Sequence, residues 1–76
     1  MKQQISTMLE LGQVLQGARA IAGMTQAEAA ARLNLSQSTV SHMELNPETV
    51  SAAQLLALLQ LYGFALYVQD AADQGR

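Results

Sequence analysis

Residues 25–44 read TQAEAAARLNLSQSTVSHME, and this stretch decides the fold. Thr25 and Glu28 have the spacing of a capping box, so a helix is expected to begin at Thr25. Asn34 tolerates the positive φ at which helices commonly end, and Ser36 is a favourable N-cap for a following helix. The stretch therefore predicts two short helices joined by a tight turn.

The apolar residues of the same stretch suit a steep crossing of the two helices. Ala30 is small where the second helix passes over the first, and Val40 is a branched residue that locks the crossing. Leu33 and Leu35 fill the space between the helices. Because protein interiors are close-packed, this combination of small and branched side chains favours a fixed crossing.

Two further helices are expected to flank this pair. A capping box at Thr7 and Glu10 begins one of them, which ends at Gly23, and a Ser51-to-Gln54 box begins a leucine-rich helix. The apolar residues of the earlier helix recur at spacings of three and four, which places them on one face. The residues expected on that inner face are Leu11, Leu15, Ala18 and Ile21.

Residues 64–69, FALYVQ, carry a strand pattern instead. Phe64, Leu66 and Val68 alternate on one face, and the aromatic and β-branched content agrees with a strand. A lone strand has an unpaired edge, which pairing with the same strand of a second subunit would remove. A fifth helix and an extended tail packed on the domain are the alternatives. Residues 71–76 are expected to form a flexible tail.

Length and composition exclude several classes of protein. The 76 residues suffice for one domain, and the absence of cysteine excludes disulfides and thiolate metal sites. No apolar run approaches the ~18 residues of a membrane span, and no signal peptide is recognisable, so a cytoplasmic protein is expected. The sequence has one histidine, scattered carboxylates and no phosphate-binding glycine loop. An enzyme, a cofactor site and a metal site are therefore not expected.

The stretch from Thr25 to Glu44 resembles the Cro/repressor-type (Xre family) helix-turn-helix. The shared features are the Thr-Gln-x-Glu-x-Ala opening, Ser36 at the start of the recognition helix and the Val-Ser-x-x-Glu ending, while Asn34 replaces the usual glycine. The resemblance implies an all-α, λ-repressor-like domain of four to five helices over residues 7–62, followed by the dimerisation strand. It also implies an ion pair between Arg19 and Glu44, which would otherwise be two unrelated surface charges.

In this architecture the recognition helix lies in the major groove of DNA. Gln37 is the best candidate for reading a base, because its amide can pair with both N6 and N7 of adenine. Gln26 is expected to hold a phosphate, and His42 either contacts DNA or is simply solvated. Short serines would sit close to bases or sugars. The predicted DNA-binding residues are Gln26, Ser36, Gln37, Ser38, Ser41 and His42.

The net charge of −2 and the pI of about 5.0 are unusual for a DNA-binding protein. The cations are Lys2, Arg19, Arg32 and Arg76. With so few cations, we expect weak monomer binding, a shallow salt dependence and a need for two half-sites roughly one helical turn apart. The competing hypothesis is a dimeric adaptor that binds a kinase-like protein and never DNA.

The second half of the chain resembles the HipB-like antitoxins. Asn46-Pro47-Glu48 precedes a leucine-rich helix ending at Leu59-Gln60, then the short strand and Asp70. This resemblance implies a cytoplasmic, nucleoid-associated homodimer that binds double-stranded operator DNA, represses its own operon and associates with a HipA-type kinase toxin. A phage-type repressor would share the DNA chemistry but predicts no kinase partner.

Overall fold

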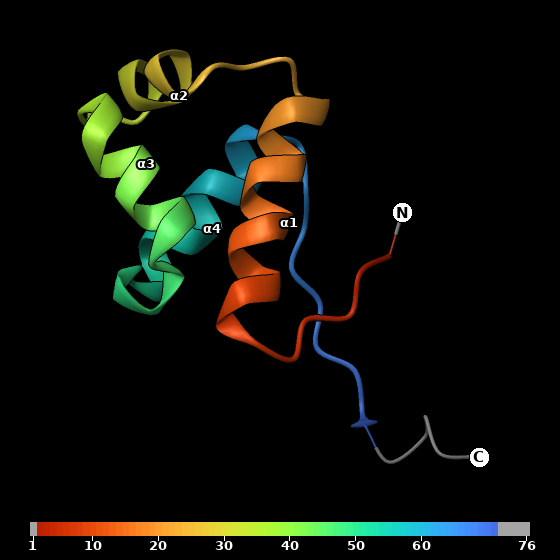
Figure 1. The fold of residues 1–76 in the computed structure, drawn as a ribbon. Helices are drawn as coiled ribbons and strands as arrows, with labels where there is room; N and C mark the ends of the chain where they lie inside the picture. The colour runs from red at the N-terminus through yellow and green to blue at the C-terminus, as the bar shows by residue number, and fades with distance from the viewer. Residues whose placement is uncertain (1, 72–76) are drawn as a thin grey trace.

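A computed structural model describes residues 2–71 of the chain. A short 3-10 helix, η1, lies between the third and fourth α-helices (Figure 1). The helices are α1 Met8–Ile21, α2 Gln26–Arg32, α3 Gln37–Leu45, η1 Pro47–Thr49 and α4 Ala52–Leu61. These elements agree with the expected all-helical domain.

The residues that begin and end the helices are those that the sequence predicted. Thr7, Thr25 and Ser51 each form a complete capping box with the residue three positions later. In the turn between α2 and α3, Asn34 has a φ of 58° and is the one non-glycine residue with positive φ within residues 2–71. The local chemistry of these positions therefore determines where each helix starts and stops.

The core lies where α1, α2, α3 and α4 meet. Leu15, Val40 and Leu58 are its largest fully buried side chains. Ala29 and Ala30 are also buried, which lets α2 lie close to its neighbours. The contacts between α2 and α3 are the most extensive in the fold. On α3, Val40 and Met43 are buried, as expected.

Ile21 is a correction to the predicted core, because its side chain is 66% exposed. Leu11, Leu15 and Ala18 are buried on the inner face of α1, as expected. After Ala18, however, the inner stripe continues four residues on at Ala22, which packs against the core. Since successive helical residues are about 100° apart, Ile21 lies to the side of that stripe.

Residues 64–70 form neither helix nor strand in the single chain. Phe64 packs against the core, whereas Leu66 is 50% exposed and Val68 is 98% exposed. A fifth helix over this segment is therefore wrong. Pairing with the strand of a second subunit stays a prediction, because a ladder needs that second strand. The predicted flexible tail lies, from residue 72 onward, outside the described residues.

Within residues 2–71, no helix combines the length and the apolar character that crossing a membrane requires.

Candidate nucleic-acid interface

One face of α3 is free of contacts with the core. Gln37, Ser38 and His42 are exposed, and Ser41 is half-buried. Ser41 lies four residues after Gln37, and His42 lies four residues after Ser38, so these side chains share one broad face. The opposite face carries Val40, Met43 and Glu44, which are buried. Packing of the inner face thus fixes which polar side chains α3 presents outward; these are the base-reading candidates from the sequence.

Ser36 has a structural task at the start of α3. Its hydroxyl oxygen accepts a hydrogen bond from the backbone N–H of Thr39 at 3.1 Å. The same oxygen lies 2.7 Å from the Thr39 hydroxyl and 3.1 Å from the Ser38 hydroxyl. The cluster fixes the first turn of α3, and it includes Thr39, which sequence reasoning did not single out.

His42 lies on the exposed face one turn before the end of α3. Its Nδ1 is 3.4 Å from the side-chain nitrogen of Asn46, a long contact in which the roles of the two atoms depend on the ring tautomer. The imidazole is exposed. It therefore stands at the edge of the polar face without being part of the core.

Arg19 and Glu44 join α1 to α3 through a bidentate ion pair. The Nε of Arg19 donates to one carboxylate oxygen of Glu44 at 2.7 Å, and Nη2 donates to the other at 3.2 Å. Nη1 donates to the backbone carbonyl of Met24 at 3.0 Å. The Glu44 side chain is 2% exposed and that of Arg19 is 19% exposed. The hydrogen bond to Glu44 raises the pKa of Arg19, against the effect of burial, so the guanidinium stays charged.

Gln26, the predicted phosphate contact, is already engaged within the chain. Its side-chain nitrogen donates to Glu44 Oε1 at 3.0 Å, and the residue is half-buried. Sequence reasoning paired Glu44 with Arg19 but did not place Gln26 beside it. The two residues are 18 positions apart, and the capping pattern around Gln26 carries no signal of a bond to α3.

Comparison with known proteins places this geometry in a family. The profile described as "Helix-turn-helix domain" matches residues 10–71. The chain belongs to the helix-turn-helix domain family. The match covers most of the chain and includes α2 and α3 with the turn between them, so α3 is the recognition helix of this helix-turn-helix protein.

Solved structures add a resemblance over nearly the whole chain. A HipB variant in an O2 20mer complex has a TM-score of 0.82 and 28% identity, covering 93% of this chain and 99% of that chain. HipB in a HipA-HipB-O2-O3 complex has a TM-score of 0.80 and 26% identity, covering 92% and 99%. A comparison with curated protein sequences gave no match. The HipB-like branch expected from the sequence is therefore confirmed by the fold comparison.

The helix-turn-helix protein has few cations to meet phosphates. Within residues 2–71, the cations other than Arg19 are Lys2 and Arg32, both exposed. Neither lies on α3, so the exposed face of the recognition helix is polar without formal positive charge. Neutral hydrogen-bond donors must therefore provide most contacts to any polyanion. The described residues contain no group of side chains suited to holding a metal ion.

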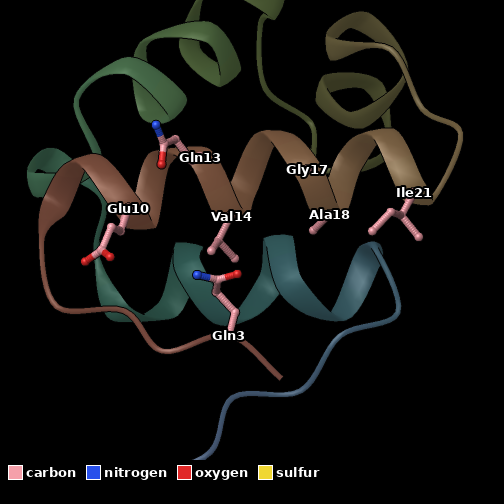
Figure 2. A pocket seen from close by; sticks show the side chains of 7 residues that line it. All are labelled: Gln3, Glu10, Gln13, Val14, Gly17, Ala18 and Ile21. Carbon is pink, nitrogen blue, oxygen red and sulfur yellow. The ribbon is translucent and has the colours of Figure 1, made fainter. Parts of the chain in front are cut away.

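A shallow groove of about 240 Å³ runs along α1 (Figure 2). Val14, Gly17 and Ile21 line its apolar part, and Gln3 reaches it from the N-terminal segment. None of its lining residues belongs to α2 or α3. The groove and the recognition face are therefore separate surfaces of the helix-turn-helix protein.

Proposed function

We propose that this protein is a sequence-specific DNA-binding repressor of the HipB antitoxin type. The observation that carries the proposal is the outward face of α3, which presents short and amide side chains while its inner face is locked in the core. Recognition helices of this family read base edges in the major groove. The similarity to a HipB structure in a 20mer complex, which covers 93% of this chain, supports the proposed DNA-binding function.

The residues of the interface have different tasks in this proposal. Gln37 reads a base edge, because a side-chain amide matches the donor and acceptor of adenine. Ser38 and Ser41 contact bases or sugars at short range, and His42 contacts the edge of the site. Ser36 holds the start of α3 in place. Gln26 donates to a phosphate, a contact that sets orientation and not sequence.

The protein acts as a homodimer in this proposal, on two half-sites of its own operator. The dimer forms through residues 64–69, whose Leu66 and Val68 are exposed in the single chain. Two linked half-sites compensate for the weak phosphate contacts of each domain. The net negative charge of the chain agrees with a need for two linked half-sites.

A kinase toxin of the HipA type is the proposed protein partner. A HipA-HipB-O2-O3 complex stands among the similar structures and supports this class of partner. The protein would then act in the cytoplasm, associated with the nucleoid, as the autoregulating antitoxin of a toxin-antitoxin operon.

The test is a titration of the protein against duplex DNA of its own upstream promoter, with a scrambled duplex as control, at two salt concentrations. We expect preference for the promoter duplex and a shallow salt dependence. Gln37→Ala is expected to lose about 1–3 kcal/mol of discrimination. Gln60→Ala, an exposed glutamine on α4, is the matched control and should bind as the unchanged protein does.

Equal binding to both duplexes at low salt would contradict the repressor function. That outcome would favour the dimeric adaptor, which binds a kinase-like partner without DNA. Loss of promoter preference in both Gln37→Ala and Gln60→Ala would instead contradict the assignment of α3 as the reading element.

A further inference from the structure

The carboxylate of Glu44 is shared by side chains from two other helices. Arg19 of α1 donates to both of its oxygens, and Gln26 of α2 donates to Oε1 at 3.0 Å. The carboxylate is almost completely buried, with the Glu44 side chain 2% exposed. One buried anion on α3 therefore ties the first residue of α2 to the recognition helix.

This arrangement fixes which way the Gln26 amide points. A carboxylate only accepts hydrogen bonds, so Gln26 must turn its nitrogen toward Glu44. The amide nitrogen has two N–H groups, and one of them is used on Glu44. Its second N–H and its carbonyl are then left for other partners. Gln26 is half-buried, so part of the residue is open to solvent.

The charges around Gln26 are compatible with a phosphate neighbour. A lone carboxylate beside a phosphate would repel it, but Glu44 is neutralised by the bidentate contact with Arg19. Because the Gln26 rotamer is held before DNA arrives, less side-chain freedom is lost on binding. Because the domain has few free cations, a preorganised neutral donor such as the Gln26 amide contributes a larger share of the phosphate contacts.

We propose that Glu44 is a positioning residue for DNA binding, in addition to joining α1 and α3. Its carboxylate, held by Arg19, orients Gln26 so that the second amide N–H meets a DNA phosphate. This inference rests on the proposed DNA-binding function and deepens it. It assigns the ion pair a role in affinity that a purely structural bond would not have.

A double-mutant cycle on promoter affinity tests the proposal. Gln26→Ala is expected to weaken binding about tenfold, to the promoter and the scrambled duplex alike, because phosphate contacts carry no sequence information. In the Glu44→Gln background, where the acceptor carries no charge, the same Gln26→Ala change should cost about threefold or less. All affinities are measured well below the melting temperature of each variant.

Two further variants separate positioning from fold stability. Leu58→Val weakens the core without touching the network, so Gln26→Ala should still cost about tenfold there. If Glu44→Gln does not fold, Arg19→Met combined with Glu44→Met replaces the buried pair by apolar side chains of similar size and also removes the acceptor.

The outcomes are distinct. An equal cost of Gln26→Ala with and without the Glu44 carboxylate would overturn the positioning role, as would the absence of any cost in the otherwise unchanged protein. Both results leave the proposed repressor function standing if the unchanged protein still prefers its promoter. If the unchanged protein shows no such preference, the proposed function fails and the inference fails with it.

Discussion

Asn34 is the residue that allows α2 and α3 to follow each other so closely. Its φ of 58° lies in the left-handed region, which costs most L-residues roughly 1–2 kcal/mol and asparagine less. The side chain is exposed, so a substitution there changes the backbone preference and little packing. The turn of this protein is thus built on a tolerated residue in place of the usual glycine.

Asn34→Ala is accordingly expected to lower the free energy of unfolding by about 1 kcal/mol. Asn34→Gly should match or slightly exceed the unchanged protein, because glycine adopts positive φ without strain. Urea denaturation of the three proteins measures the difference. An alanine variant as stable as the glycine variant would show that the turn does not depend on this conformation.

The close approach of α1 to α3 depends on Gly12. A Cβ placed on Gly12 would meet the backbone carbonyl oxygen of Glu44, and it would lie 3.4 Å from Cγ of Pro47. Backbone atoms cannot move aside as the end of a flexible side chain can. Since Glu44 also carries the carboxylate bound by Arg19, the close approach positions the ion pair as well.

Gly12→Ala is therefore expected to lower the free energy of unfolding by about 1–3 kcal/mol, as overpacking does. Gly17→Ala is the matched control on the same helix, since a Cβ there meets nothing within 4 Å. That control should stabilise the protein by roughly 0.5–1 kcal/mol. Thermal and urea denaturation of both variants measure these changes in stability. Equal changes for the two substitutions would refute the role assigned to Gly12.

The capping boxes of α1 and α2 give the helices a pH dependence. Hydrogen bonds from the backbone N–H of Ser6 and the Thr7 side chain lower the pKa of Glu10, and bonds from the backbone and side chain of Thr25 lower that of Glu28. A carboxyl whose pKa is lower in the folded state stabilises the fold above its unfolded-state pKa. That contribution is lost as the pH falls through the folded-state value.

Replacing Glu10 and Glu28 together by glutamine should therefore reduce the loss of melting temperature on acidification from pH 7 to below about 4. Glutamine can keep the capping-box hydrogen bond but does not titrate. Circular dichroism melts at both pH values provide the measurement. Glu48→Gln, at an exposed glutamate outside any capping box, serves as the control. An unchanged pH response in the double variant would contradict this account.

The elements themselves could be predicted because their boundaries are local. Capping residues such as Thr25 and Ser36 act on N–H groups within three positions, so sequence alone locates them. The bond between Gln26 and Glu44 depends on how α2 lies against α3, which no local pattern specifies. Ile21 was misplaced for a related reason: three-residue and four-residue steps both suit a helix, and tertiary packing selected Ala22.

For the whole molecule, the C-terminal segment is the clearest sign of a missing partner. After Gly63 the chain leaves α4 as an extended stretch that leads away from the helices (Figure 1). Phe64 anchors this stretch to the core, while Leu66, Tyr67 and Val68 are exposed. Exposed apolar side chains on an unpaired extended backbone favour pairing with an identical segment.

Val68→Asp tests that pairing without disturbing the single chain, because Val68 is 98% exposed. We expect this variant to be monomeric in sedimentation at concentrations where the unchanged protein is a dimer, since a charged side chain would replace an apolar one that the pairing is proposed to bury. Its melting temperature at low concentration should equal that of the unchanged monomer. Its operator affinity should fall at least tenfold, because the two half-sites are no longer linked.

Leu9→Asp is the matched control, because Leu9 is an exposed leucine on α1, outside the segment that is proposed to pair. That control should stay dimeric and bind the operator as the unchanged protein does. A dimer that survives Val68→Asp would move the interface away from residues 64–69, toward a surface such as the groove along α1. An unchanged protein that is monomeric at every concentration would contradict the dimer itself, and the operator contacts of α3 would then have to provide all of the affinity.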